Sequence, residues 1–240
     1  MKWELILSDA ASGKKNMEFD MNLVRNCTEE QGFFRLYYWK PYAISLGANQ
    51  KESEINTALA FENNIDVVKR PTGGRAILHA EELTYSVALP LSYGLKPREV
   101  YEKISRALIR GLSIYDVRLS DAALESEQPD FGNILKQQSG MLCFASTAKN
   151  EVKLHGKKII GSAQRKIGGH VLQHGSVLIG DYHTKLPNFL NLNEEEKKIL
   201  EMELKEKTTE VETVLNEKVD YKRFEDAVIK GFEEEWEIKF

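Results

Sequence analysis

The spacing of hydrophobic residues predicts both helices and strands in the first third of the chain. Hydrophobic residues recur at helical spacing over residues 16–28, which predicts an amphipathic helix. A second helix is expected along Ile55 and Leu59. Short runs rich in aromatic and β-branched residues predict strands, which in chain order cover residues 3–7, 33–39, 42–46 and 66–69.

The remainder of the chain continues this mixture of elements. A strand is predicted over residues 83–89, and Pro97 begins a predicted helix with hydrophobic residues along one face. Residues 120–139 are polar and rich in turn formers, which predicts a long loop. Glu and Lys at helical spacing predict helices from residue 193 onward. Three further strands are predicted over residues 151–154, 158–162 and 171–179.

These elements favour one fold class. Because they lack regular βαβ alternation, we expect an α+β fold in which a largely antiparallel mixed sheet is packed with helices. A length of 240 residues suits a single domain over residues 1–240, with residues 193–240 as a helical carboxy-terminal extension of that domain.

Composition and charge exclude several classes of function. Hydrophobic residues make up 42% of the chain and charged residues 29%, as in an ordinary globular protein. The net charge of -4 argues against a dedicated nucleic-acid binder. No apolar run reaches membrane-spanning length, and the start of the chain is too short and too acidic for a signal peptide. We therefore expect a cytoplasmic protein with free thiols that binds neither nucleic acid nor membrane.

Two segments join cationic side chains to small residues. In residues 69–76, Gly73 and Gly74 allow a turn with positive φ whose N–H groups are presented outward, and Arg70 and Arg75 flank it. In residues 157–165, the small residues Gly161, Ser162 and Ala163 likewise lie next to cationic side chains, here in a β-like segment. Each segment alone fits an ordinary turn or tight strand equally well, but the pair favours a shared ligand groove.

The cysteines and histidines suggest no metal site. Cys27 lies on the apolar side of a predicted helix and is interpreted as a buried small hydrophobe. His170 and His174 are four residues apart in a predicted strand, which is too far to share a metal ion easily. Cys143, by contrast, follows the long predicted loop.

Several motifs in this order resemble those of one known superfamily. Residues 70–79 with residues 82–86, then residues 158–165 and 172–176, are similar to the signature of the lipoyl and biotinyl protein ligases. The resemblance extends from the helix at residues 16–20 to the helix at residues 231–233. It implies the catalytic-domain architecture of that superfamily.

The superfamily contains ligases that activate a free acid with ATP and transferases that form a thioester on a cysteine. Residues 141–144, with Cys143 before Phe144, resemble the Cys-Phe of the cysteine-dependent (LipM-type) octanoyltransferases. The turn sequence Thr-Gly-Gly-Arg-Ala and the following Glu-Leu-Thr-Tyr also resemble that group. The chain is expected to lack the additional carboxy-terminal domain of many ligases. These features favour the transferases.

This resemblance implies a mechanism without a cofactor. Cys143 takes octanoate from acyl carrier protein, and the lysine of a lipoyl domain, such as the glycine-cleavage H protein, then receives it. A thiol is only slightly ionised at neutral pH, so a Lys158 ammonium close to Cys143 would activate it. Once neutral, Lys158 would accept a proton from the incoming amine. Backbone N–H groups of the glycine turn or after Lys158 would stabilise the oxyanion. A monomer is expected.

The resemblance and the small-residue segments together give the predicted substrate-binding residues. They are Arg70, Thr72, Gly73, Gly74, Arg75, His79, Gly161, Ser162, Ala163, Gln164, His174 and Gly175. An apolar tunnel for the eight-carbon chain is expected over Val87, Ile160 and Val177. Positive side chains are expected to steer acidic protein partners; they are Lys69, Arg70, Arg75, Lys157, Lys158, Arg165 and Lys166.

Three alternatives remain open at this point. In an ATP-dependent lipoate ligase, Lys158 would bind an acyl-adenylate and Cys143 would be incidental. A related transferase would move octanoate from the H protein to other lipoyl domains, again through a cysteine. In a different class, the chain would be a non-catalytic module that binds lipoyl domains or acyl carrier protein.

Overall fold

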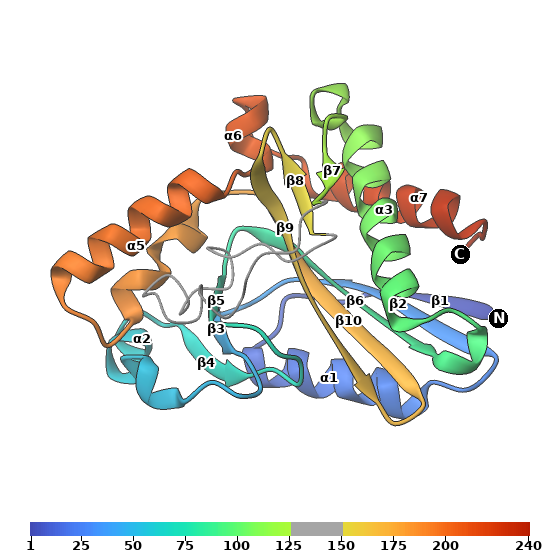
Figure 1. Ribbon diagram of the computed structural model, residues 1–240, viewed down its shortest axis with the longest axis horizontal. Coiled ribbons are helices and arrows are strands. Elements are labelled where there is room, and N and C mark those ends of the chain that lie inside the picture. Colours follow the sequence, from blue (N-terminus) through green and yellow to red (C-terminus); the bar gives the residue numbers. More distant parts are fainter. Residues whose placement is uncertain (126–150) are drawn as a thin grey trace.

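The computed structural model describes residues 1–125 and 151–240 (Figure 1). It consists of a large and a small β-sheet with helices packed around them, which confirms the predicted α+β class. No helix within these two ranges is long and apolar enough to cross a membrane.

The large sheet has seven strands in the order β1-β2-β6-β10-β9-β8-β7. Strand β1 is parallel to β2, and every other neighbouring pair is antiparallel. The predicted antiparallel character is therefore confirmed. In chain order the strands are β1 (Lys2–Leu7), β2 (Gln31–Tyr37), β6 (Glu82–Pro90), β7 (Ala123–Leu124), β8 (Val152–Leu154), β9 (Lys157–Ile167) and β10 (His170–Leu178).

The small sheet has three strands in the order β4-β3-β5. Strand β3 (Ala43–Leu46) is parallel to β4 (Asp66–Lys69) and antiparallel to β5 (Ile77–His79). Helix α2 (Thr57–Glu62) lies in the connection between β3 and β4. Although β2 and β3 are consecutive, they belong to different sheets.

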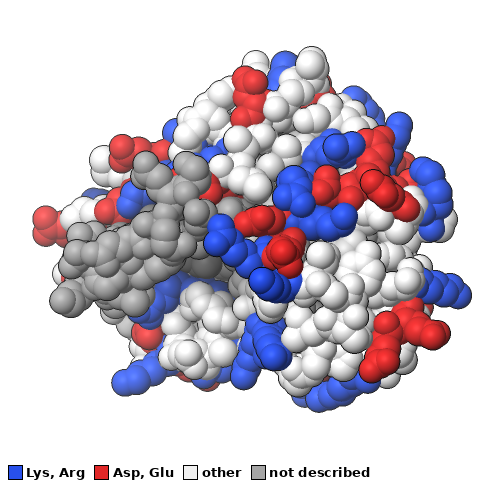
Figure 2. All heavy atoms as spheres, turned by 45° about the vertical axis from the view of Figure 1, so that its right-hand side comes forward, with Lys and Arg blue, Asp and Glu red and all other residues white. Residues whose placement is uncertain are grey.

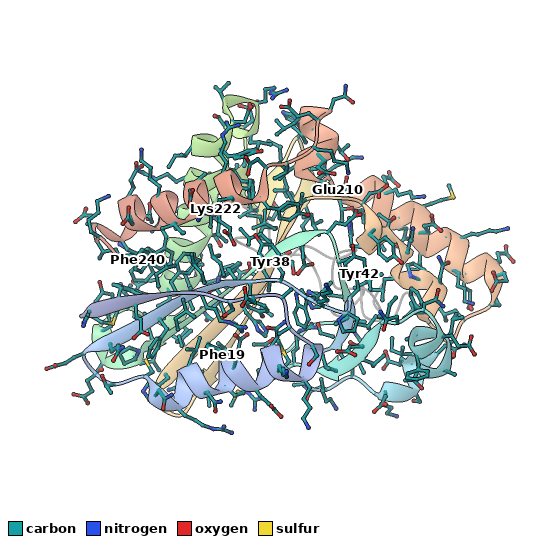
Figure 3. The ribbon with its side chains drawn as sticks, turned by 180° about the vertical axis from the view of Figure 1, so that it is seen from behind. Phe19, Tyr38, Tyr42, Glu210, Lys222 and Phe240 are labelled. Atoms are coloured by element: carbon teal, nitrogen blue, oxygen red, sulfur yellow. The ribbon has the colours of Figure 1, made fainter. Side chains whose placement is uncertain are left out.

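Helices cover both faces of the large sheet. Neighbouring residues on a strand point to opposite faces, and on β2 Phe33 packs in the apolar cluster of helix α1 (Gly13–Asn26). Phe34 packs instead with helices α3 (Pro97–Tyr115) and α7 (Tyr221–Trp236) in the largest apolar cluster. Seen from behind, β1 and β2 run between α1 and α7 (Figure 3). There the hydroxyl of Tyr38 donates to Glu225 on α7 at 2.9 Å.

The remaining helices pack near the small sheet and at the far end of the large one. Helix α5 (Glu194–Lys207) begins at Asn193, whose side chain accepts a hydrogen bond from the N–H of Glu196. Helix α5 packs with the 3-10 helix Tyr182–Phe189 against the small-sheet core. The short helices are α6 (Val211–Leu215) and the 3-10 turns Glu52–Glu54, Leu91–Tyr93 and Val117–Leu119.

The predicted strands and helices are present with boundaries shifted by a few residues. Among the described residues, the hydrophobic pattern did not predict β5, β7 or the 3-10 helices, of which Tyr182–Phe189 is the longest. The predicted loop over residues 120–139 lies mostly outside the described residues, and its first part contains β7. The assignment of residues 193–240 as an extension of the domain stays a prediction.

Candidate active site

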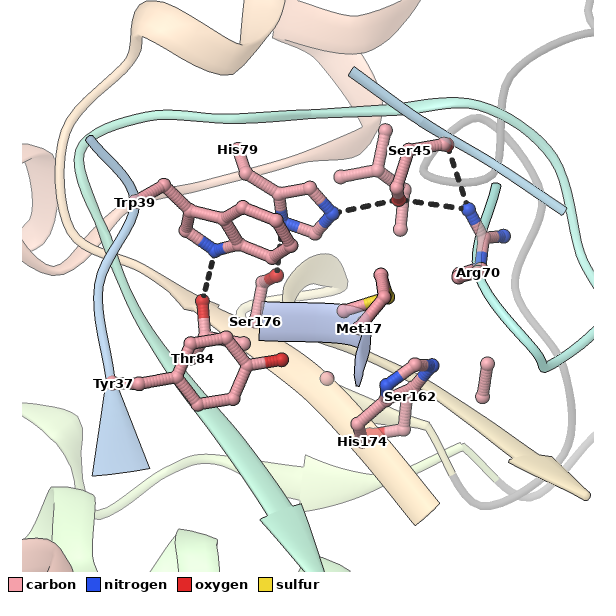
Figure 4. A pocket seen from close by; sticks show the side chains of 14 residues that line it. Met17, Tyr37, Trp39, Ser45, Arg70, His79, Thr84, Ser162, His174 and Ser176 are labelled. Atoms are coloured by element: carbon pink, nitrogen blue, oxygen red, sulfur yellow. Dashed lines mark hydrogen bonds between the residues drawn. The ribbon is translucent and has the colours of Figure 1, made fainter. Parts of the chain in front are cut away.

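A small cavity of about 20 Å³ lies between the two sheets and helix α1 (Figure 4). Seven predicted site residues line it: Arg70, His79, Gly161, Ser162, Ala163, His174 and Gly175. Its other lining residues, which the sequence analysis missed, are Met17, Tyr37, Trp39, Ser45, Ile77, Thr84 and Ser176. The remaining predicted binding residues, Thr72, Gly73, Gly74, Arg75 and Gln164, lie around the cavity without lining it, and Cys143 lies outside the described residues.

Arg70 is buried and holds the glycine turn together. Its guanidinium donates to the carbonyl of Ser45 at 2.8 Å and to the carbonyls of Gly73 and Arg75 at 2.9 and 2.6 Å. The sequence led us to expect that Arg70 would present its charge to a partner protein. With only 3% of its surface exposed, Arg70 does not do so. Its role here is to fix the backbone.

Glycine is required at two positions near this turn. Gly74 has a φ of 93°, so the expected positive φ is present there, whereas Gly73 does not have one. Across the turn, a Cβ on Gly47 would lie 1.9 Å from the carbonyl oxygen of Gly74. The absence of a side chain at Gly47 therefore lets the end of β3 approach the turn. The side chain of Arg75 lies 4.0 Å from Glu54.

A chain of hydrogen bonds connects helix α1 to the glycine turn through His174. Nδ1 of His174 lies 3.1 Å from Oδ2 of Asp20, and Nε2 lies 2.6 Å from the hydroxyl of Thr72. Asp20 also pairs with Arg35 at 2.8 Å and accepts hydrogen bonds from Tyr37 and Ser86. All of these residues are buried.

The pKa values of His174 and Asp20 determine which of these hydrogen-bonded groups is charged. Burial lowers the pKa of His174 and outweighs the opposing effect of Asp20, so the imidazole is neutral. For Asp20, burial acts to raise the pKa, but the hydrogen bond from His174, the charge of Arg35 and the hydrogen bond from Ser86 prevail and leave it below its usual value. Asp20 is therefore a carboxylate that only accepts hydrogen bonds.

A second chain starts at Glu82 on β6. Nδ1 of His79 lies 2.8 Å from Oε1 of Glu82, and Nε2 lies 2.7 Å from the hydroxyl of Ser45. Arg70 donates to the same hydroxyl at 3.0 Å (Figure 4). Burial acts to raise the pKa of Glu82, but His79 and the hydrogen bonds from Thr84 and Ser176 prevail and lower it. The ring of His79 stacks on Trp39, whose Nε1 donates to Thr84 at 2.7 Å.

These two series of hydrogen bonds share the carboxylate–histidine–hydroxyl connectivity of a hydrolase triad. Thr72 and Ser45 are both fully buried, and Ser45 accepts a hydrogen bond from a guanidinium. Each polar side chain that lines the cavity is hydrogen-bonded to another protein group. The cavity therefore presents mainly ring faces, methyl groups and backbone carbon to its contents.

Lys158 and Glu151 form a buried pair at the start of β9. Nζ of Lys158 donates to Oε1 of Glu151 at 2.8 Å, and both side chains are almost completely buried. Lys158 could be predicted from its motif, whereas Glu151 could not, because its position just before β8 carries no local signal. Lys158 does not line the cavity, although Gly161, three residues further along β9, does.

The small residues of β9 and β10 meet where the strands cross the cavity. A Cβ on Gly175 would lie 2.3 Å from the carbonyl oxygen of Gly161 and 2.9 Å from the ring of Tyr85. The hydroxyl of Tyr85 lies 2.6 Å from that of Ser162. A larger residue at position 175 would therefore collide with β9 and with the ring of Tyr85. The predicted Gln164 donates to Gln173 and to the carbonyl of Pro97, so it orders the strands around the cavity.

The residues predicted to line an acyl tunnel lie on the opposite face of the large sheet from the cavity. Val87, Ile160 and Val177 belong to the apolar cluster with α3 and α7 and do not line the cavity. The periodicity of β6, β9 and β10 reveals that these residues are apolar, but it does not reveal which face carries the cavity.

Comparison with known proteins identifies the family. The family model described as the lipoyl protein ligase A/B catalytic domain matches residues 12–233. The chain belongs to this family. The resemblance predicted from the glycine turn, the Lys158 segment and the His174 segment is therefore confirmed.

Curated relatives of this family member include several octanoyltransferases. Octanoyltransferase LipM of Exiguobacterium sp. is 32% identical to it over 99% of this chain and 88% of its own length. The LipM proteins of Clostridioides difficile and Bacillus subtilis are 30% and 31% identical, and they match 100% and 96% of this chain and 89% and 85% of their own lengths.

Solved structures share the fold at lower identity. A bipartite lipoate protein ligase from Thermoplasma acidophilum, described with its E2 lipoyl domain, superposes with a TM-score of 0.77 at 20% identity over 100% of this chain and 86% of that chain. A lipoate-protein ligase A bound with ATP gives a TM-score of 0.78 at 21% identity over 100% and 87%. These likenesses confirm the ligase-type catalytic fold of this family member.

Proposed function

We propose that this chain is an octanoyltransferase that moves octanoate from acyl carrier protein, through a thioester on Cys143, to the lysine of a lipoyl domain such as the glycine-cleavage H protein. The class of enzyme rests on the octanoyltransferase relatives, which match nearly the whole chain. The donor, the acceptor and the use of Cys143 are the parts that the following arguments support.

The inner surface of the cavity is the observation that carries the proposal. Because the polar groups around it are hydrogen-bonded to one another, an acyl chain packed against this surface leaves no polar group unpaired. Met17, Tyr37, Trp39 and Ile77 supply an apolar surface around that space (Figure 4). An aliphatic chain suits such a site better than a charged or sugar-like ligand.

Lys158 supports a reaction centre at one end of this cavity. Gly161 lines the cavity, and three residues of strand place Lys158 about 10 Å further along β9. Glu151 fixes the position of the Lys158 ammonium at 2.8 Å. We propose that this held ammonium faces Cys143 and favours its thiolate.

The proposed chemistry balances without ATP. The Cys143 thiolate attacks the carbonyl of the donor thioester, and the carrier thiolate leaves and takes up a proton. The amine of the acceptor lysine then attacks the new thioester, loses a proton, and releases the Cys143 thiolate as the amide forms. Thioester exchange is nearly isoenergetic and amide formation from a thioester is downhill, so no activating nucleotide is needed.

The positively charged residues that we expected to steer partners do not form one surface. On the face in Figure 2, Lys and Arg lie among Asp and Glu. Lys157 and Arg165 are eight residues apart on β9, which separates them by about 26 Å. Arg25, Lys69 and Arg165 instead line an open groove beside α1. We propose that this groove steers an acidic partner, and Arg165→Glu should then slow association at low salt more than Lys157→Glu.

The deciding experiment is intact mass spectrometry after mixing the protein with octanoyl-acyl carrier protein without ATP. We expect one added octanoyl group that hydroxylamine removes and a lipoyl domain discharges. Cys143→Ala should abolish the adduct. Cys27→Ala is the matched control, because Cys27 is buried beside the carbonyl of Gln31 and burial raises its pKa to about 11. Its removal should leave the adduct unchanged.

The other outcomes identify the alternatives. Octanoylation of a lipoyl domain from free octanoate and ATP in both wild type and Cys143→Ala would mean that the chain is a ligase. An adduct formed only from an octanoylated H protein would mean transfer between lipoyl domains. Binding of a lipoyl domain without any acyl transfer would indicate a non-catalytic module.

A further inference from the structure

Two hydrogen-bond chains reach the glycine turn from different elements. The first, which we call the α1 arm, consists of Asp20, His174 and Thr72. The second, the β6 arm, consists of Glu82, His79, Ser45 and Arg70. Each arm starts at a buried carboxylate and ends on the turn formed by residues 70–75.

The direction of each hydrogen bond in the α1 arm follows from its charges. Asp20 only accepts, so the Nδ1–H of His174 donates to it and Nε2 of the neutral ring is left as an acceptor. The hydroxyl of Thr72 must then donate to Nε2, at 2.6 Å. The carbonyl of Thr72 accepts from the N–H of Ala48 at 2.9 Å. Thr72 is thus fixed through its side chain and its backbone.

The β6 arm is fixed at both of its ends. Arg70 can only donate, so the Ser45 oxygen accepts from it at 3.0 Å, and the same hydroxyl lies 2.7 Å from Nε2 of His79. Glu82 is a carboxylate that only accepts, so the Nδ1–H of His79 donates to it. The guanidinium uses its other N–H groups on the carbonyls of Gly73 and Arg75. The β6 arm therefore holds the turn just after the residue that the α1 arm holds.

Arg35 and the hydrogen-bond donors around the arms keep both carboxylates ionised. Arg35 on β2 pairs with Asp20, and Arg70 and His79 face His174 from the turn and from β5. On the β6 arm, His79 faces Glu82, which also accepts from Thr84 and Ser176. Ionised carboxylates keep the two histidines oriented with Nε2 toward the hydroxyls.

The turn that the arms hold has hydrogen-bond donors to offer. Within residues 1–125 and 151–240, no group accepts a hydrogen bond from the N–H of Gly73 or Gly74. Both glycines are exposed, and a Cβ on Gly73 would meet nothing within 4 Å. Donors that are already oriented before the reaction stabilise a developing negative charge without reorganisation.

We propose that Asp20 and Glu82 are positioning residues that act through His174 and His79 to preorganise the Gly73–Gly74 turn. Neither carboxylate touches the substrate. The catalytic part of this inference rests on the proposed acyl transfer, because the turn would face the thioester carbonyl. The structural part, that the arms hold the turn, does not depend on that function.

The structural part is tested by hydrogen exchange at the amides of Ala48 and Arg70, which donate to the carbonyls of Thr72 and Leu46. In Asp20→Asn and Glu82→Gln, the exchange of the Ala48 amide should accelerate by about 2- to 10-fold, as expected when a hydrogen bond of typical strength is weakened. His183→Gln is the matched control, because His183 is equally buried but contacts Thr208. It should leave the Ala48 amide unchanged.

Substitutions at Thr72 keep the test independent of any folding defect in the carboxylate variants. Thr72→Val removes only the hydroxyl and should accelerate exchange at Ala48, whereas Thr72→Ser retains the hydroxyl and should restore the wild-type rate. In single-turnover acylation, Thr72→Val and Asp20→Asn should lower the maximal rate about 10-fold with little change in the half-saturating donor concentration, since the turn acts on the transition state.

The possible results separate the two proposals. Wild-type exchange at Ala48 in both Thr72→Val and Asp20→Asn would overturn the inference. Accelerated exchange with an unchanged acylation rate would overturn its catalytic part. If wild type forms no acyl-enzyme but the exchange differences are present, the proposed function is wrong while the arms still hold the turn.

Discussion

The two faces of the large sheet are stabilised in different ways. Toward α3 and α7 the contacts are apolar, and they include the stacked rings of Phe34 and Phe232 with centroids 4.1 Å apart. Toward α1 and the small sheet, fully buried charges and hydroxyls surround the cavity. The first face depends on filled volume, whereas the second depends on the direction of each hydrogen bond. Substitutions that preserve volume should therefore separate the two faces.

The largest effect is expected from Arg35→Met on the polar face. Arg35 pairs with Asp20 at 2.8 Å and also donates to Asn16 and Ser8. Its loss leaves a buried carboxylate without its cation, which should lower the free energy of unfolding by about 3–5 kcal/mol in urea titrations. As a control, Arg106→Met removes an ion pair with Glu235 whose arginine is half exposed and should cost about 0–1 kcal/mol. Equal losses in both variants would contradict the comparison.

Thr84→Val should have a smaller effect on the same face. The side chain keeps its shape, but Nε1 of Trp39 loses its acceptor and Glu82 loses one donor. We expect a loss of about 1–3 kcal/mol in the free energy of unfolding, measured by thermal and urea denaturation. Thr213→Val, whose hydroxyl contacts Glu210 near the surface, should be close to neutral. A neutral Thr84→Val would show that hydrogen-bond direction matters little there.

Ile160→Val probes the apolar face. Removing one methylene from this buried site should lower the free energy of unfolding by about 0.5–1.5 kcal/mol. Because Ile160 packs toward α3 and α7, the rate of acylation and the preference for chain length should not change. A shift in chain-length preference, measured with carriers bearing six to ten carbons, would restore the tunnel role predicted from the sequence.

The smallest effect is a dependence of stability on pH. The pKa of His174 is lowered from its ordinary value of 6.5, so the unfolded chain binds this proton at a higher pH than the folded chain. The lowered pKa of Asp20 acts in the same direction at lower pH. The contribution of these two groups to the free energy of unfolding is therefore fully present above pH 6.5, and it should be lost progressively as the pH falls. His174→Gln should show a smaller fall between pH 7 and pH 5, although His183, whose pKa is also lowered, continues to contribute.

Most elements of the fold could be predicted because they carry strong local patterns. Helix α3 has a continuous apolar face and a proline at its start, and β6 is a long β-rich run. Strand β5 was missed because three residues after a turn are too few to show a period. The separation of β2 and β3 into two sheets could not be predicted, since a strand pattern contains no information about its partner.

The site was predictable only where it forms a motif. The glycine turn and the small residues of β9 and β10 could be found, because backbone geometry demands those residue types. The buried roles of Asp20, Arg35 and Glu82 could not be predicted, even though Glu82 lies in one of the motifs, because a charged residue in a helix or strand ordinarily indicates a solvent-exposed position. Their burial depends on contacts between segments far apart in the chain. The participation of Cys143 stays a prediction.

Those distant contacts also determine when the cavity comes into existence during protein synthesis. Strand β10 supplies His174 to the α1 arm and Ser176 to Glu82, although Asp20 precedes His174 by 154 residues and Glu82 precedes Ser176 by 94. Until β10 has left the ribosome and paired with β6, the earlier segments lack the partners that complete both arms. An unfinished chain thus lacks the completed cavity, which forms only once the last strand of the site is in place.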